Sequence, residues 1–112
     1  MVAGWVPEAG EVIWVDLNPT LGCEQAGHRP CLVLTPSSYN NKTNLAVACA
    51  MTTAQKGYPF EVTMPDGGII LVDQLKTLDW RSRKAKSKGV FAPPKVLQQV
   101  RALLGTLLRI GS

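Results

Sequence analysis

Residues 14–30 of this 112-residue chain (WVDLNPTLGCEQAGHRP) hold most of the side chains whose types suit chemistry. Arg29 offers a planar fork of N–H donors that matches a phosphate group. Glu24 and His28 are each able to accept a proton. Further along, Thr52 ends an apolar run, and a threonine hydroxyl can bind a phosphate oxygen. A phosphate-containing substrate is therefore one interpretation of these residues.

Each of these side chains also has an ordinary structural interpretation. Arg29 stands at a strand entrance, where a surface salt bridge is equally consistent with its position. A single histidine is more often a solvated loop residue than a catalyst, and Trp14 also fits a core position. A nucleophilic pair of Cys23 and His28 is a minor alternative. Spacing alone therefore does not single out a reaction.

Charge is unevenly distributed along the chain. Residues 1–79 carry all eight acidic residues and four basic ones, whereas residues 80–112 carry eight basic residues and no acidic one. Such asymmetry suggests a polyanionic partner, which would be nucleic acid, an acidic protein segment or an anionic surface. A solvated basic loop followed by a helix explains the same pattern without a partner.

The composition limits the class of protein. With 46% hydrophobic and 18% charged residues, the chain is expected to form one globular domain over residues 1–112. No apolar stretch approaches the ~20 residues of a membrane span, and the N-terminus lacks the pattern of a signal peptide. Three cysteines and one histidine without zinc-ligand spacing predict no metal, no cofactor and a reducing compartment such as the cytoplasm.

Short runs of β-branched, aromatic and alternating residues predict strands that would position these side chains. The predicted strands cover residues 11–17, 31–35, 45–51, 60–64, 68–72 and 76–80. Between them we expect a polar loop over 19–30, a turn-rich connection over 37–44 and a charged loop over 81–89. In the run 45–51 the larger side chains are expected to face the core, and three alanines would let another surface approach the other face.

The C-terminal segment 94–110 has helical periodicity and begins with a proline, which suits a first helical turn. Its apolar stripe consists of Val96, Leu97, Val100, Leu103, Leu104, Leu107 and Leu108. Together the elements predict an antiparallel, barrel-like or sandwich-like sheet with one terminal helix against it.

Several separated blocks of the sequence resemble, in order, the MazF/PemK family of bacterial toxins, and most closely its MazF members. The blocks are residues 10–20, 22, 24–30, 39–43, 52–53, 56–62, 73–76 and 80–81. The resemblance runs from about Val6 to Leu108. It implies a mainly β fold, an SH3-like barrel of the MazF/CcdB type with a C-terminal α-helix, and a symmetric homodimer.

The same resemblance implies an activity and its partners. Members of the family are metal-independent, sequence-specific endoribonucleases that cleave single-stranded RNA, chiefly messenger RNA. The expected partner is a labile MazE-like antitoxin whose acidic tail occupies the RNA groove. Operator DNA is expected to be bound only through the complex with the antitoxin.

The resemblance also implies roles for individual residues. Arg29 would stabilise the developing negative charge, Thr52 would donate a hydrogen bond to a phosphate oxygen, and Glu24 is favoured over His28 as the general base. The RNA-binding candidates are Trp14, Asn18, His28, Asn40, Lys56, Gln74 and Arg81, with Trp80 as an alternative to Trp14 for base stacking.

Two other functions share this fold class. A CcdB-like toxin would poison DNA gyrase without cleaving RNA, and a non-catalytic module would bind the antitoxin and nucleic acid only. Fold does not separate these functions. Incubation with single-stranded RNA in EDTA does, because only the nuclease yields defined fragments.

Overall fold

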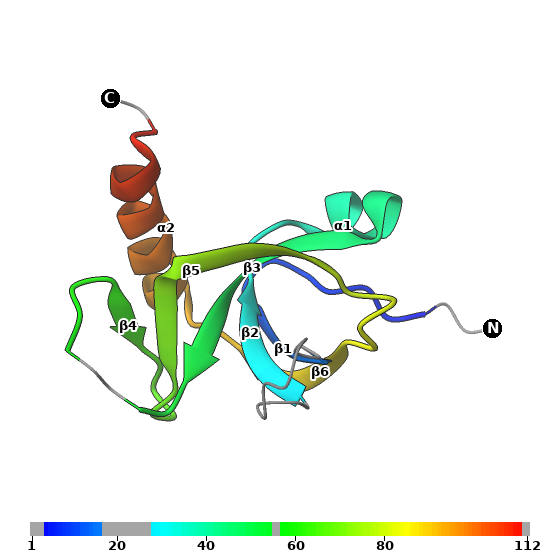
Figure 1. The fold of residues 1–112 in the computed structure, drawn as a ribbon, viewed down its shortest axis with the longest axis horizontal. Coiled ribbons are helices and arrows are strands. Elements are labelled where there is room, and N and C mark those ends of the chain that lie inside the picture. Colours follow the sequence, from blue (N-terminus) through cyan, green and yellow to red (C-terminus); the bar gives the residue numbers. More distant parts are fainter. Residues whose placement is uncertain (1–3, 17–27, 55–56, 111–112) are drawn as a thin grey trace, which may run out of the picture.

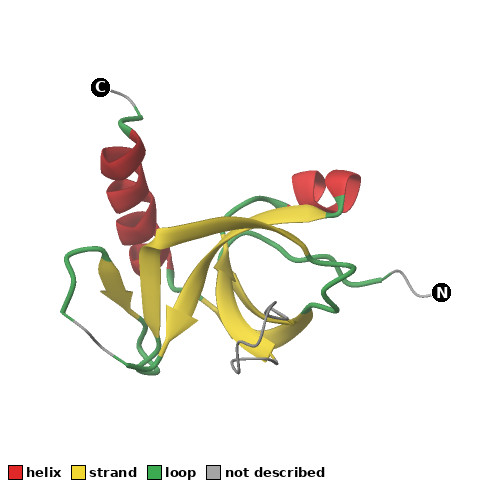
Figure 2. Cartoon of the chain, in the orientation of Figure 1, coloured by secondary structure: helices red, strands yellow, loops and turns green. Residues whose placement is uncertain are grey.

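The computed structural model describes residues 4–16, 28–54 and 57–110. In chain order its elements are β1 (Glu11–Asp16), β2 (His28–Val33), α1 (Ser37–Thr43), β3 (Leu45–Thr52), β4 (Glu61–Thr63), β5 (Ile69–Asp79), β6 (Lys86–Phe91) and α2 (Pro94–Leu108). Figures 1 and 2 show a strongly curved sheet with α2 beside one end of it and α1 on the other side.

The six strands form one antiparallel sheet in the order β4-β5-β3-β2-β1-β6. The predicted mainly β fold with a C-terminal helix is thereby confirmed. Within the described residues, the outer strands β4 and β6 each pair with a single neighbour, so the barrel is open rather than closed. The central strands β2 and β3 are hydrogen-bonded to a neighbouring strand on both edges. This pairing fixes the backbone positions of both strands.

Apolar residues are buried on both faces of the sheet, because successive side chains of a strand point to opposite faces. The core on the α2 side, which we call the helix-side core, consists of Val12, Leu32, Cys49, Met51, Val62, Met64, Ile70, Val72, Ala92, Val96, Val100 and Leu104. The core on the other face, which we call the tryptophan-side core, consists of Ile13, Val15, Cys31, Val33, Ala46, Ala48, Leu78 and Trp80.

Strand β3 illustrates how both faces are used. Cys49 and Met51 are buried in the helix-side core, as expected for the larger side chains. The expectation fails for Leu45 and Val47, which are only half-buried. On the alanine face of β3, Ala46 and Ala48 are fully buried in the tryptophan-side core, whereas Ala50 is half-buried, so the surface that approaches the two buried alanines belongs to the chain itself.

Three connections differ from the sequence-based expectations. Residues 37–43 form the helix α1 rather than a turn-rich segment. Asn44 ends this helix in a left-handed conformation, and its N–H donates a hydrogen bond to the Asn40 carbonyl. The two strands predicted over 68–72 and 76–80 are one continuous strand, β5 (Ile69–Asp79), whose register against β3 shifts between Cys49 and Met51. The predicted loop 81–89 ends in strand β6, because an edge strand pairs through its backbone and tolerates charged side chains.

Helix α2 was predicted correctly but is only partly covered. It contacts β4 and β5, and Val96, Val100 and Leu104 are buried on its inner side. Leu107 and Leu108 belong to the same sequence stripe but are exposed in the described chain. Figure 1 shows the C-terminal turns of α2 extending beyond the sheet. No helix among the described residues has the length and apolarity needed to cross a bilayer.

The uneven burial of α2 predicts unequal effects of truncating its leucines. Leu104 is 9% exposed in the helix-side core, whereas Leu108 is 52% exposed. We expect Leu104→Ala to lower the free energy of unfolding by ~2–5 kcal/mol through lost burial and a residual cavity. The matched change Leu108→Ala is expected to change the stability of the monomeric fold by less than about 0.5 kcal/mol. Urea denaturation of both variants measures the difference, and equal losses would contradict the packing described here.

The two described cysteines predict how stability depends on alkaline pH. Burial raises the pKa of Cys31 from 9.0 to about 11 and that of Cys49 from 9.0 to about 12. Between pH 9 and about 10 both thiols therefore stay mostly protonated in the folded chain, while the unfolded chain ionises them. Since the unfolded state then binds fewer protons, the free energy of unfolding is expected to fall as pH rises above 9.

This pH dependence is measured by urea denaturation between pH 8 and 10.5, with the double variant Cys31→Ala/Cys49→Ala as reference. Lysine titration affects both proteins alike, so the difference in slope isolates the two thiols. Parallel stability curves for the two proteins would show that the thiols do not contribute.

Candidate functional site

The register between β2 and β3 brings two predicted catalytic residues together. In that ladder Cys31 lies opposite Ala50. This is the last pair of the ladder, and Arg29 and Thr52 each lie two residues beyond it, Arg29 before Cys31 on β2 and Thr52 at the end of β3. Two residues that are 23 positions apart in the sequence are therefore brought to the same end of the sheet.

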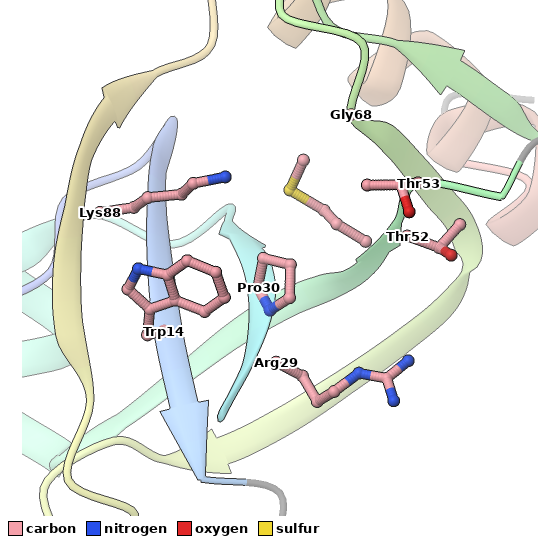
Figure 3. Close-up of a pocket in the computed structure, with 8 residues that line it drawn as sticks. Trp14, Arg29, Pro30, Thr52, Thr53, Gly68 and Lys88 are labelled. Carbon is pink, nitrogen blue, oxygen red and sulfur yellow. The ribbon is translucent and has the colours of Figure 1, made fainter. Parts of the chain in front are cut away.

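A pocket of about 310 Å³ lies at this end of the sheet. Its described lining residues are Trp14, Arg29, Pro30, Met51, Thr52, Thr53, Gly68 and Lys88. Figure 3 shows Thr52 and Thr53 on one side, Trp14 and Lys88 on the other, and the Arg29 side chain extending toward the threonine side. Arg29 and Lys88 are the charged members of this lining, so the pocket is suited to an anionic ligand.

The ends of four strands explain why these residues meet. Strands β1 and β3 finish here, whereas β2 and β5 begin here, because all four are antiparallel neighbours. Trp14 pairs with Pro30 across β1 and β2, and both rings line the pocket. The pocket thus combines an aromatic wall, two cations and two hydroxyls in one place.

The hydroxyl of Thr52 is held in a defined orientation. Its Oγ1 accepts a hydrogen bond from the backbone N–H of Ala54 at 3.1 Å. A hydroxyl has one proton to donate and two lone pairs to accept with. The contact with Ala54 uses a lone pair and leaves the Thr52 proton able to point toward a bound anion.

Lys88 is a site residue that the sequence reasoning did not single out. Its Nζ lies 5.1 Å from the centroid of the Trp14 ring, and the side chain passes above the indole in Figure 3. The sequence contained two signals, the basic run over residues 81–88 and the glycine that follows Lys88. Because residues 81–89 were expected to form a loop, the pairing of β6 with β1, which places Lys88 near Trp14, was not predicted.

Arg81 and Gln74 are not among the described residues that line the pocket. Arg81 follows Asp79, which pairs with Leu45 at the beginning of β3. Thr52 is at the other end of this eight-residue strand, roughly 23 Å away at ~3.3 Å per residue. Gln74 is exposed within β5, beyond the part of that strand that reaches the pocket.

The side chain of Arg81 is instead used near α1. Its guanidinium donates hydrogen bonds to the side-chain oxygens of Asn44 and Asn41. The same group lies 4.4 Å from the centroid of the Trp80 ring. Arg81 therefore joins the end of β5 to α1 and covers Trp80.

Asn40 is fully buried, which contradicts the expectation that it contacts RNA. Its side-chain nitrogen donates to the carbonyls of Pro7 and Thr35, each at 2.9 Å, and its side-chain oxygen accepts from the Thr35 hydroxyl at 2.7 Å. A buried amide that is satisfied in this way stabilises the fold. No part of it is available to a ligand.

Trp80 is likewise a core residue and not a stacking platform. It is 4% exposed, and its indole N–H donates to the Asn40 carbonyl at 3.0 Å. The Trp5 ring packs against it edge-to-face with a centroid separation of 5.8 Å. Of the two tryptophans proposed for base stacking, Trp14 is therefore the one that lines the pocket.

The remaining predicted residues lie partly or wholly outside the described chain. Glu24 and Asn18 fall in residues 17–27, and Lys56 falls in residues 55–56. For His28 the described feature is its backbone, which pairs with Asp16 at the pocket end of β1 and β2. The roles of these four residues stay predictions.

Comparison with known proteins agrees with this fold. A family model described as PemK-like, MazF-like toxin of type II toxin–antitoxin system matches residues 8–108. The chain is 48% identical to the endoribonuclease toxin MazF of Escherichia coli K12, covering 96% of this chain and 99% of that protein. It is 34% identical to the endoribonuclease PemK of Escherichia coli, covering 90% of this chain and 81% of that protein.

A solved structure shows the same likeness in three dimensions. A chain of the MazE-MazF crystal structure (Form-II) from Deinococcus radiodurans matches with a TM-score of 0.90 and 46% identity, over 96% of this chain and 100% of that chain. The sequence match and the structural match both extend over nearly the whole chain. The chain therefore belongs to the PemK-like, MazF-like toxin family of type II toxin–antitoxin systems.

Proposed function

We propose that this chain is a metal-independent, sequence-specific endoribonuclease that cleaves single-stranded RNA, chiefly messenger RNA. The observation that carries the proposal is the placement of Arg29 and Thr52 in one pocket with Trp14. Such a pocket offers donors for a phosphate and a ring for a base. The names of the relatives described above support the same activity.

The proposed reaction uses a nucleophile that the substrate supplies. The ribose 2′-OH attacks the adjacent phosphorus, and the bond from phosphorus to the 5′-oxygen of the next nucleotide breaks. The 2′-OH proton passes to a base, and the departing 5′-oxygen takes up a proton. The products are a 2′,3′-cyclic phosphate and a 5′-OH. The protein therefore has to supply a base, an acid and donors for the charged transition state, and no metal-activated water.

Arg29 is the proposed stabiliser of that transition state. Its planar guanidinium presents several N–H donors in a fixed fork that fits two phosphate oxygens. Fixed donors of this kind typically contribute a few kcal/mol each to lowering the barrier.

Thr52 is the proposed donor to a non-bridging phosphate oxygen. Its hydroxyl already accepts from the Ala54 N–H at 3.1 Å, so the proton is the part left for the substrate. Because Thr52 and Arg29 line the same pocket, we propose that both groups reach one phosphate. Thr53 lines the same pocket and offers a second hydroxyl beside it.

The family motif supplies the proposed proton-transfer groups. We favour Glu24 as the general base from its place in that motif, with His28 as the competing candidate. In the sequence, Glu24 lies between Asp16 and His28, and these two residues pair at the pocket end of the sheet.

We also propose which side chains read the RNA sequence. Trp14 offers an aromatic surface on which one unpaired base can stack. Asn18, His28, Lys56, Gln74 and Arg81 remain candidates for polar contacts with the RNA. Asn40 is removed from this set because it is fully buried.

The partners are proposed from the same charge pattern. A MazE-like antitoxin with an acidic tail would compete with RNA, because Arg29 and Lys88 attract either polyanion. Operator DNA would be bound only by the toxin–antitoxin complex. We further propose a symmetric homodimer, which is supported by the exposed apolar side chains of Leu107, Leu108 and Ile110 near the C-terminus.

Cleavage of RNA in the presence of EDTA tests the proposed activity. We expect single-stranded RNA to yield defined fragments that carry a 2′,3′-cyclic phosphate and a 5′-OH, because the nucleophile belongs to the substrate. Sequencing of the fragment ends, before and after removal of the cyclic phosphate, measures the chemistry and the cleavage sequence together. Intact RNA accompanied by stalled DNA gyrase would favour a gyrase poison instead.

Replacement of the two donors tests their roles. Arg29→Ala and Thr52→Ala are each expected to lower the cleavage rate by ~10²-fold or more, because each removes a donor to the transition state. Thr52→Ser, which keeps the hydroxyl, is expected to retain much more activity than Thr52→Ala. Circular dichroism and size-exclusion chromatography check that the variants fold and associate as the parent does. Unfolding of both alanine variants would show that these residues are structural.

A further inference from the structure

We propose that Lys88 is a displaceable cover for the Trp14 ring, and this inference rests on the ribonuclease function proposed above. In the RNA-free protein its ammonium group occupies a face of the indole. When single-stranded RNA binds, a base takes that face, and the ammonium moves to a neighbouring backbone phosphate. One lysine would thus keep the stacking surface covered and then add a phosphate contact.

An irregularity in strand β6 aims Lys88 at the ring. Val12 pairs with Val90, but the next residue, Ile13, pairs with Ser87, so the register against β1 shifts by two residues. Lys88 and Gly89 lie between these two pairs and have no opposing residue on β1 in this register. Gly89 has a φ of +79°, a conformation that favours glycine. Bulges of this kind bend a strand and redirect a side chain. The bulge in β6 therefore places the Lys88 side chain over the Trp14 indole.

The contact between the two side chains is a cation–π interaction. The Lys88 Nζ lies 5.1 Å from the centroid of the Trp14 ring, within the range at which an ammonium is attracted to an aromatic face. Lys88 is exposed and Trp14 is half-buried. The ammonium can therefore leave the ring without disturbing the core.

A base is able to displace this ammonium because stacking of a nucleobase on an aromatic ring is stronger than an exposed cation–π contact. The displaced charge does not have to return to bulk water. The base carries its phosphates with it, and the flexible stem of a lysine lets the ammonium reach one of them. In Figure 3 the Lys88 side chain already extends across the pocket toward its centre.

The position of Lys88 gives it a role different from that of Arg29. Arg29 lies on β2 opposite the end of β3, beside the two threonines, whereas Lys88 lies on β6 beyond Trp14. The two cations therefore flank the pocket from different strands. We assign Arg29 to the scissile phosphate and Lys88 to a phosphate next to it, with the stacked base between them.

The test measures binding of an RNA that cannot react. The probe is a single-stranded RNA whose cleavage site was mapped in EDTA, resynthesised with a 2′-deoxyribose at the nucleotide that supplies the attacking hydroxyl. We expect Lys88→Gln to weaken binding by about 3- to 10-fold at moderate salt. Loss of one phosphate contact is also expected to reduce the slope of log K against log salt by about 0.7, the value for single strands.

Matched variants separate this role from a general effect of charge. Lys42→Gln removes the same charge from α1, at the opposite end of β3 from Thr52, and is expected to keep the parental affinity and slope. Lys88→Arg keeps the cation and is expected to restore both. Lys88→Met serves as a second neutral variant if Lys88→Gln folds poorly, as judged by circular dichroism.

Quenching of tryptophan fluorescence by acrylamide tests the cover directly. The contribution of Trp14 is obtained as the signal that is lost in Trp14→Phe. In the free protein, Trp14 is expected to be quenched more readily in Lys88→Gln than in the parent, because its ring is uncovered. With saturating RNA probe the two proteins are expected to be quenched alike, because a base covers the ring in both.

The outcomes distinguish the inference from the function on which it rests. If the parent protein cleaves the unmodified RNA but Lys88→Gln binds the probe with the parental slope, the Lys88 inference is wrong and the nuclease function stands. Failure of Lys88→Arg to restore the slope would also overturn it, because the charge would then not be what matters. If the parent does not cleave RNA at all, the proposed function fails and the inference fails with it.

Discussion

The antiparallel register of β2 against β3 is the constraint on which the candidate site depends. Both strands are central in the sheet, and their paired residues Cys31, Leu32, Cys49 and Ala48 have no exposed surface. A slip of one residue would move these side chains to the wrong face and unpack both cores. The same slip would also change the spacing of Arg29 and Thr52, because those two residues lie just beyond the last pair of this ladder. The energy that fixes the core therefore also fixes the spacing of the two proposed donors.

A second group of polar residues stabilises the opposite end of the molecule. The side-chain amide of Asn40 donates to the Pro7 and Thr35 carbonyls, and the backbone carbonyl of Asn40 accepts from the Trp80 indole N–H. These contacts attach the N-terminal segment, α1 and the end of β5 to one another, and Trp5 packs on Trp80 from outside. The blocks that resemble the toxin family thus include residues, such as Asn40 and Trp80, that are buried and stabilise the fold.

The basic C-terminal segment does not form a single patch. Lys86 and Lys88 lie on β6 near the pocket, Arg81 lies beside α1, and Lys95 and Arg101 lie on α2. One member of this segment, Lys88, is placed over an aromatic ring at the pocket by a bulge in its strand. The net charge of the segment predicted a polyanionic partner, but only the strand pairing shows which of its cations reaches the pocket.

The sequence by itself determined the types and order of the elements wherever side-chain periodicity was strong. Strands β1 and β3, the hairpin between β4 and β5, and helix α2 followed from alternation, turn residues and the apolar stripe. Arg29 and Thr52 were also predicted as site residues from the sequence, because the family motifs include them.

Tertiary structure determined the features that side-chain periodicity does not encode. It made α1 a helix around the buried Asn40, and it paired a charged segment as β6 through its backbone alone. It also buried Trp80 while leaving Trp14 at the pocket. The physical reason is that alternation reports which face of an element a residue occupies, whereas strand register and bulges, which arise from long-range pairing, decide which faces meet.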